Sequence, residues 1–131
     1  PQVQALGALP GVLVTGRVED VRPWLAHARV VVAPLRIARG IQNKVLEAMA
    51  MGLPVVVARE CGGAVDAVPE RDFLTAESVE DYVRQIGILL DSPERRAAIG
   101  TAAREQGLAR YSWDAHLSII DRYLESARSA A

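Results

Sequence analysis

Residues 30–58 read VVVAPLRIARGIQNKVLEAMAMGLPVVVA, with an apolar run at each end and an amphipathic pattern between them. The runs at 30–35 and 54–58 are continuously apolar, which is typical of parallel strands covered on both faces. The pattern at 41–51 predicts a helix between them, ended by a glycine and followed by a proline. A strand, a helix and a strand in this order predict an α/β layer sandwich with a parallel sheet and right-handed crossovers.

Two more apolar runs flank this centre and extend the predicted sheet to about four strands. The run at 12–18 is interrupted by Gly16, and a weaker run lies at 73–76. A helix is expected at about 20–28, between the first two runs. No repeat or linker divides the chain, so residues 1–77 are expected to form the β/α core of a single domain.

Three helices are predicted after residue 77, each beginning after a serine. The predicted N-caps are Ser78, Ser92 and Ser112. Asp81 stands three residues after the first cap, and Pro93 follows the second. The last helix has an apolar stripe that consists of Trp113, Leu117, Ile120, Tyr123 and Leu124. Residues 78–131 are therefore expected to be C-terminal helices of the same domain.

The composition is that of a soluble globular domain. Of the 131 residues, 50% are apolar and 24% are charged, and the net charge is −1. This balance excludes a disordered chain and lacks the basic excess of a nucleic-acid-binding protein. A single cysteine, Cys61, excludes an internal disulfide, and no Cys/His spacing indicates zinc. No run reaches the ~18 apolar residues of a membrane span, so a cytoplasmic protein is expected.

The predicted helix at 41–51 has a polar side opposite its apolar positions. Gly40, Asn43, Lys44 and Glu47 lie on this side. The first turn offers free amides and the positive end of the helix dipole, which suits a diphosphate, and Glu47 suits a ribose diol. The cations nearby are Arg36, Arg39 and Lys44. Two alternatives stay open, because Lys44 and Glu47 can form a surface ion pair and the arginines can be solvated loop charges.

The run 43–56, NKVLEAMAMGLPVV, resembles the donor-site signature of family-4 type glycosyltransferases with the GT-B fold. The segments that also match this family are Gly16-Arg17-Val18, Trp24-Leu25, Ala28-Arg29-Val30, Cys61-Gly62-Gly63-Ala64 and Tyr111-Ser112-Trp113. The sequence of residues 38–44, ARGIQNK, is most similar to that of bacterial exopolysaccharide-type sugar transferases, including those of PEP-CTERM/exosortase systems. The resemblance covers nearly the whole chain.

This resemblance implies a three-layer Rossmann-like domain, the donor-binding half of a GT-B enzyme. Such an enzyme transfers a sugar from a UDP- or GDP-type nucleotide sugar to a saccharide or lipid-linked acceptor, usually with retention and without a metal or other cofactor. The resemblance implies that Glu47 accepts hydrogen bonds from the ribose hydroxyls. It places the base near Gly16, Arg17 and Val18. The residues it places near the diphosphate or donor sugar are Arg39, Gly40, Ile41, Gln42, Asn43 and Lys44. It identifies no catalytic residue.

The chain departs from the family pattern in two ways. Many relatives have a glutamate where this chain has Arg39, so the donor sugar is either bound differently or carries an acidic group. The family's first two strands and its N-terminal acceptor domain are missing, so residues 1–131 are expected to be a partial domain that is inactive alone. The strand at 12–16 would then have an open edge, which is expected to re-pair locally or to join another copy of the chain.

Other functions and roles remain open at this point. The alternatives to a transferase are a sugar-nucleotide epimerase of the same fold and a non-catalytic nucleotide- or protein-binding module. Cys61 is expected to be a partly buried thiol rather than a nucleophile. His27 is expected to be a helix-cap or surface group, and His116 is expected to pack or to face solvent. The arginines at 95, 96 and 104 are expected to form a solvated face. The alternative is a basic patch that holds the protein at the inner face of a membrane.

Overall fold

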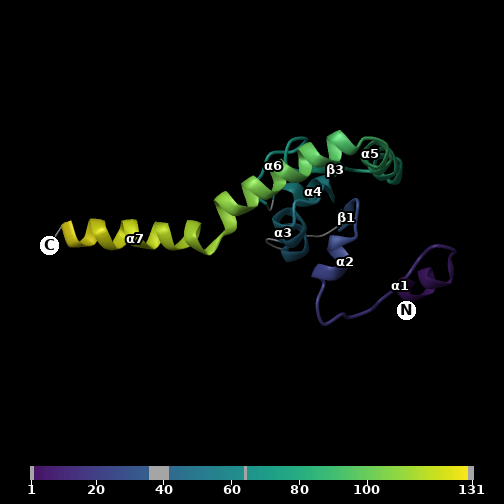
Figure 1. Cartoon of the computed structure of the whole chain (residues 1–131), viewed down its shortest axis with the longest axis horizontal. Helices are drawn as coiled ribbons and strands as arrows, with labels where there is room; N and C mark the ends of the chain where they lie inside the picture. Colours follow the sequence, from purple (N-terminus) through teal and green to yellow (C-terminus); the bar gives the residue numbers. More distant parts are fainter. Residues whose placement is uncertain (1, 36–41, 64, 130–131) are drawn as a thin grey trace.

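The chain is described by a computed structural model that covers residues 2–35, 42–63 and 65–129, apart from the side chains at 116, 119, 127 and 129. A parallel sheet of three strands lies at its centre (Figure 1). The strands are β1 (Val31–Ala33), β2 (Val55–Ala58) and β3 (Leu74–Ala76). Their order is β1-β2-β3, with Val32 opposite Val56 and Val57 opposite Thr75. The apolar runs at 30–35, 54–58 and 73–76 therefore each contain a strand, as predicted.

Helices precede, separate and follow the strands along the chain. They are α1 (Gln2–Ala5), the 3-10 helix η1 (Leu6–Ala8), α2 (Arg22–Ala26), α3 (Asn43–Ala50), α4 (Arg59–Gly62), α5 (Val79–Asp91), α6 (Pro93–Tyr111) and α7 (Trp113–Ser129). The helices predicted at 20–28 and 41–51 are confirmed as α2 and α3, each shorter than predicted.

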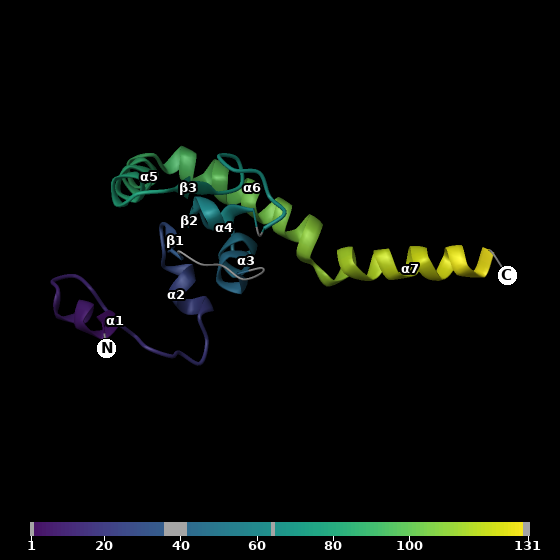
Figure 2. The same ribbon diagram turned by 180° about the vertical axis from the view of Figure 1, so that it is seen from behind.

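Helices cover both faces of the sheet, and the strand side chains enter two cores. The core on the side of α3 and α6 includes Ala33, Val45, Ala48, Met49, Val55, Val57, Phe73 and Ala103. The core on the side of α5 and the first turns of α6 includes Val56, Leu74, Ala76, Leu89 and Ile99. Figure 2 shows α3 and α5 on different sides of the strands. The prediction of an α/β layer fold is confirmed.

The three predicted serine caps are confirmed. Ser78 accepts a hydrogen bond from the Asp81 amide at 3.1 Å, and the Asp81 carboxylate accepts one from the Ser78 amide at 3.3 Å. Ser92 and Ser112 each accept a hydrogen bond from the amide three residues on, at 3.2 Å. These bonds satisfy amides that have no acceptor within their own helix, which fixes where α5, α6 and α7 begin.

Two arginines of α6 close the ends of neighbouring helices. Arg104 donates from Nη1 to the Ala50 carbonyl at the end of α3, at 2.7 Å. Arg96 donates to the carbonyls of Leu89 and Leu90 at the end of α5, at 2.7 and 2.8 Å. A guanidinium at a helix C-terminus satisfies unpaired carbonyls and opposes the negative end of the dipole. Two of the three arginines predicted to form a solvated face, Arg96 and Arg104, therefore hold neighbouring helices together.

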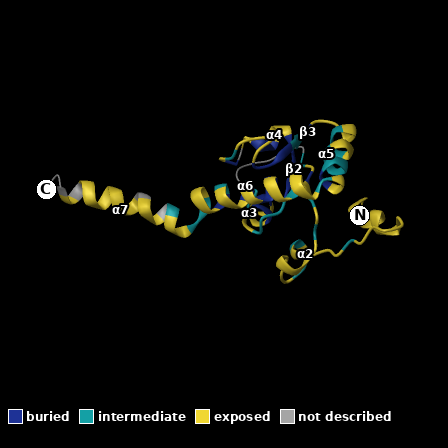
Figure 3. Ribbon diagram, turned by 45° about the horizontal axis from the view of Figure 1, so that its top comes forward, coloured by how far each residue is buried: buried dark blue, intermediate teal, exposed yellow. Residues whose placement is uncertain are grey.

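The last helix, α7, extends away from the sheet, and Figure 3 shows it as largely exposed. The predicted apolar stripe forms, but it is open to solvent: Trp113 is 83% exposed and Tyr123 is 74% exposed. In an ordinary domain such a stripe is packed against another element. No described helix is both long enough and apolar enough to cross a membrane.

The prediction of a strand at 12–18 is wrong. Gly11 and Gly16 have φ angles of 76° and 65°, so the backbone turns at both ends of the central apolar residues. No described segment pairs with this run, and a strand without a hydrogen-bonded neighbour gains nothing from an extended backbone. The described sheet therefore has three strands, and its edge on this side is β1. Self-association through a sheet edge stays a prediction.

Candidate functional site

Helix α3 carries the predicted polar side on the outside of the molecule. Its buried residues are Val45, Ala48 and Met49, which pack toward the sheet. Asn43, Lys44 and Glu47 are exposed, as the periodicity predicts. Within the described residues no ion pair joins Lys44 to Glu47. Lys44 and Glu47 therefore do not form the surface ion pair that was left open as an alternative, and the Glu47 carboxylate faces solvent.

The backbone on either side of α3 explains why the helix begins and ends there. Gln42 is the N-cap, and its carbonyl accepts a hydrogen bond from the Val45 amide at 2.9 Å. Gly52 follows the helix with a φ of 71°, the left-handed conformation that ends helices. Of the other residues predicted to contact the diphosphate or donor sugar, Arg39, Gly40 and Ile41 lie outside the described residues.

The three residues predicted near the base lie in another part of the chain. Gly16 and Arg17 are exposed and Val18 is half-buried, and all three precede α2. Figures 1 and 2 show the segment before α2 leading away from the sheet. Among the described residues, no hydrogen bond or ion pair joins Gly16, Arg17 or Val18 to Glu47, and their contact with a nucleotide stays a prediction.

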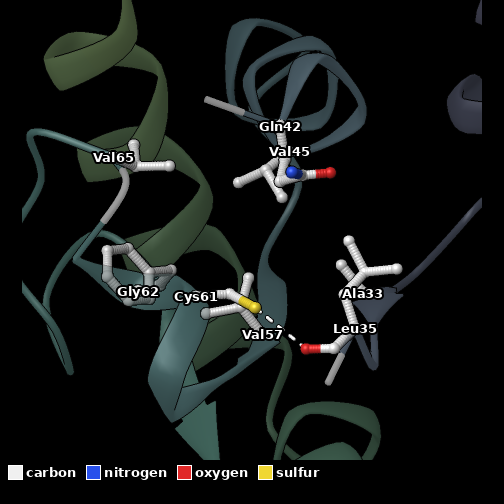
Figure 4. A pocket seen from close by; sticks show the side chains of 9 residues that line it. Ala33, Leu35, Gln42, Val45, Val57, Cys61, Gly62 and Val65 are labelled. Carbon is white, nitrogen blue, oxygen red and sulfur yellow. Dashed lines mark hydrogen bonds between the residues drawn. The ribbon is translucent and has the colours of Figure 1, made fainter. Parts of the chain in front are cut away.

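A small cavity lies beneath the start of α3, between the ends of β1 and β2 (Figure 4). Its volume is about 10 Å³, which is room for about one water molecule. Its lining residues include Leu35, Gln42 and Cys61, and the remainder of its wall is mostly aliphatic. The Cys61 thiol is buried and donates to the Leu35 carbonyl at 2.9 Å. The thiol is therefore more deeply buried than the partly buried group that was predicted.

A larger hollow of about 500 Å³ opens where the carboxyl ends of all three strands meet. Open α/β sheets bind ligands at this edge. The lining residues are Pro34, Leu35, Ala58, Glu60, Ala76, Glu77, Ser78, Val79 and Tyr82. None of the described residues that were predicted for the site is among them. Glu60 and Glu77 were missed, although each follows a strand within two residues, and that position was the available signal.

Tyr82 has the most unusual environment in this hollow. Its hydroxyl is buried and has no hydrogen-bond partner in the described part of the chain. Burial raises the pKa of this hydroxyl, and the nearby Cys61 and Glu60 raise it further. The phenol is therefore a neutral hydrogen-bond donor at physiological pH. Tyr82 was not among the residues predicted for the site.

The remaining acidic, histidine and cysteine side chains are the other candidates for metal ligands within the part of the chain that the structure describes. Within the described residues, no three His, Cys, Asp or Glu side chains are grouped closely enough to hold a metal ion. The His27 Nδ1 atom is hydrogen-bonded to the Pro23 carbonyl at 2.7 Å, as a surface group within its own helix end. The side chain of His116 is outside the described part of the structure.

Comparison with known proteins relates the chain to sugar transferases. The family described as "Glycosyl transferases group 1" matches residues 1–92. The sulfoquinovosyl transferase SQD2 of Arabidopsis thaliana is 44% identical over 77 residues, which are 54% of this chain and 15% of that protein. A GDP-mannose-dependent monoacylated α-(1-6)-phosphatidylinositol monomannoside mannosyltransferase of Corynebacterium glutamicum is 33% identical over 108 residues, 76% of this chain and 28% of that protein.

The fold has a solved counterpart in a sucrose-phosphate synthase from Thermosynechococcus elongatus. The two chains superpose with a TM-score of 0.77 at 22% sequence identity, over 99% of this chain and 33% of that one. The chain thus spans a third or less of the length of these proteins. The family match covers most of the chain, and the sheet with helices on both faces agrees with it. This chain therefore belongs to the glycosyl transferases group 1 family.

Proposed function

We propose that residues 1–131 are the donor-binding domain of a glycosyltransferase that uses a UDP- or GDP-type nucleotide sugar. The observation that carries this proposal is the exposed Glu47 carboxylate on α3, with no ion pair among the described residues. A carboxylate without an ion pair can accept hydrogen bonds from two adjacent hydroxyls of a ribose. The family membership and the GDP-mannose dependence stated in the name of one relative support a nucleotide-sugar donor.

The diphosphate and donor sugar are proposed to lie at the start of α3. The positive end of the α3 dipole lies at Asn43, where the side chains of Asn43 and Lys44 are exposed. We propose that backbone amides of Gly40, Ile41 and Gln42 also contact the donor. Arg39 is close in sequence to Lys44 and is proposed as a second cation for the diphosphate or donor sugar. The base is proposed to reach Gly16, Arg17 and Val18. Transfer with retention, without a metal, would need no further ionisable group from this domain.

Calorimetric titration of the chain with UDP, GDP and ADP tests this proposal. We expect one of the three to bind, and we expect Glu47→Ala to weaken that binding about tenfold, because the ribose hydroxyls lose a charged acceptor. Glu105→Ala removes another exposed carboxylate, from α6, and is the matched control, expected to bind as the wild type does. An unchanged affinity in Glu47→Ala would refute the ribose role of Glu47.

Arg39 is proposed to read an acidic group on the donor sugar, such as a carboxylate or a sulfonate. A guanidinium pairs with both through two parallel hydrogen bonds. The relative named for the sulfoquinovosyl group, a sulfo-sugar, supports this proposal. We expect nucleotide sugars with an acidic sugar to bind about fivefold more tightly than neutral ones with the same nucleotide. Arg39→Gln is expected to remove this difference between acidic and neutral sugars when each affinity is compared with the variant's own affinity for the free nucleotide. A preference that survives this substitution would contradict the role of Arg39.

The whole protein is proposed to contain an N-terminal acceptor domain that packs on α7. Leu117, Ile120 and Leu124 are 49–57% exposed on one stripe of this helix, and an uncovered stripe of this kind fits an interdomain contact. The proposed acceptor is a saccharide or a lipid-linked saccharide in bacterial cell-surface polysaccharide synthesis, at the cytoplasmic face of the membrane. The lipid named in one relative's acceptor supports this class. The domain alone is then expected to bind donor without transferring sugar.

A further inference from the structure

The hollow at the carboxyl ends of the three strands lies apart from the site proposed at Glu47. Glu47 is not among the described residues that line it, and α3 lies on the other side of the strands from α5 (Figure 2). The volume of the hollow, about 500 Å³, falls in the range of small-molecule sites, which is about 300–1,000 Å³. The proposed nucleotide site leaves this space unused, so it is available to a second ligand.

Hydrogen-bond donors line the hollow at the start of α5. The Tyr82 hydroxyl is buried and has no hydrogen-bond partner among the described residues, which is unfavourable until an acceptor reaches it. The Ser78 oxygen accepts from the Asp81 amide, which leaves its own proton to be donated. Val79 is the first residue of α5, so its amide has no acceptor within the helix. A ligand here meets donors that the protein itself leaves unused.

Hydrogen-bond acceptors line the same hollow at α4 and after β3. Glu60 is exposed, and its carboxylate has no ion pair within the described part of the chain. The Glu77 carboxylate is held by the Arg59 Nε atom at 2.6 Å. Two carboxylates oppose a phosphate, and an apolar ligand would leave the polar groups unpaired. Among the described residues no group of three acidic, histidine or cysteine side chains could hold a metal ion. The set fits a neutral ligand that both donates and accepts.

We propose that this hollow binds a neutral saccharide unit, separately from the nucleotide of the donor. A sugar hydroxyl donates one hydrogen bond and accepts others, so adjacent hydroxyls match the Glu60 carboxylate and the Tyr82 hydroxyl. The side chains of Pro34, Leu35 and Val79 offer apolar surface to the C–H groups of the ring. The buried Tyr82 hydroxyl meets the sugar after a side-chain rotation, which is common on binding. In the intact enzyme the saccharide is part of the acceptor, and this last assignment alone rests on the proposed function.

Two conservative substitutions remove one polar group each from the hollow. Tyr82→Phe keeps the ring and removes a hydroxyl that has no partner in the described part of the chain, so urea unfolding is expected to show no loss of stability. Glu60→Gln keeps the shape of the side chain and removes its charge. The matched controls are Tyr123→Phe on α7 and Glu105→Gln on α6, which change exposed residues outside the hollow.

The test is calorimetric titration of the chain with two neutral disaccharides, maltose and mannobiose. We expect at least one to bind in the millimolar range, and we expect Tyr82→Phe and Glu60→Gln each to weaken that binding about fivefold. Both controls and Glu47→Ala are expected to bind the disaccharide as the wild type does. No binding of either disaccharide at about 10 mM overturns the inference, as does unchanged affinity in Tyr82→Phe or equal weakening in the controls.

Titration with UDP and GDP separates this inference from the proposed function. Tyr82→Phe is expected to leave nucleotide affinity unchanged, because Tyr82 and Glu47 belong to different sites. A chain that binds a disaccharide through Tyr82 but binds neither nucleotide would contradict the proposed function and support the saccharide site. A chain that binds a nucleotide but neither disaccharide would support the proposed function and overturn the saccharide site.

Discussion

Replacing Gly100 by alanine is expected to lower the free energy of unfolding by about 3 kcal/mol. A Cβ on Gly100 would lie 2.1 Å from the Gly52 carbonyl oxygen and 2.9 Å from its carbonyl carbon. Both atoms are backbone, so no side chain can rotate to make room. Gly52 itself is held by hydrogen bonds at the end of α3, where its amide donates to the Met49 carbonyl at 2.9 Å. Helices α3 and α6 would have to separate.

Gly107→Ala is the matched control, because Gly107 is a buried glycine of the same helix. A Cβ there would lie 3.8 Å from the nearest atom, the Cβ of Met49, which is an ordinary contact. This substitution is expected to raise stability by about 0.5–1 kcal/mol, the helix-propensity difference between glycine and alanine. Urea unfolding of both variants measures the contrast. Equal stability changes in the two variants would show that the backbones of α3 and α6 do not approach each other at Gly100.

The contact at Gly100 also matters for the candidate site, because α6 holds the helix that carries Glu47. The guanidinium of Arg104, one turn after Gly100, binds the last carbonyl of α3. A nucleotide affinity that falls in Gly100→Ala and not in Gly107→Ala is therefore expected from the displacement of α3. The effect of Gly100→Ala on nucleotide affinity is indirect, and its effect on stability is expected to be the larger one.

Local signals in the sequence predicted those parts of the fold that depend on a few neighbouring residues. The capping box of Ser78 and Asp81 and the caps at Ser92 and Ser112 need only residues three positions apart, and all are confirmed. The two faces of α3 follow from helical periodicity, which is also local. For the same reason Glu47 was found without knowledge of the fold, although its role stays a proposal.

Features that depend on distant segments were not accessible in this way. The run at 12–18 has the composition of a strand, but a strand also needs a hydrogen-bonded neighbour, which the described sheet does not give it. The hollow with Tyr82 exists because three strand ends and the start of α5 meet there, from residues 34 to 82. The thiol of Cys61 finds its acceptor 26 residues away. Composition and residue spacing do not show which distant segments of the chain come into contact.

Asp72→Ala is expected to lower the free energy of unfolding by about 2 kcal/mol. Asp72 is 0% exposed, and its carboxylate accepts from the Val68 amide at 2.7 Å and from Arg71 at 2.7 and 2.9 Å. Removing it leaves the Val68 amide without its acceptor in the turn that leads into β3. Asp66→Ala is the control in the same loop, because the Asp66 pair with Arg110 is exposed and is expected to contribute less than about 1 kcal/mol. Urea unfolding at pH 7 compares the two variants.

The contribution of Asp72 is also expected to depend on pH in a defined direction. Burial by itself raises the pKa of this carboxyl, but the hydrogen bonds from Arg71 and the Val68 amide outweigh burial and bring the pKa below its usual value. The charged form is thus favoured by folding. Its stabilising effect is complete above the ordinary carboxyl pKa of about 3.9 and is lost as the pH falls through the lower pKa of the folded state.

Urea unfolding of the wild type and of Asp72→Asn between pH 7 and pH 3 tests this direction. The asparagine does not titrate, and the other carboxyls titrate alike in both proteins, so their effects cancel in the difference. The wild type is expected to be more stable by a constant amount down to about pH 5, and the gap is expected to narrow below about pH 4. A difference in free energy of unfolding between the wild type and Asp72→Asn that stays constant to pH 3 would mean that the charge of the buried carboxylate does not stabilise the fold. The turn would then be held by neutral hydrogen bonds and by the packing of Phe73 alone.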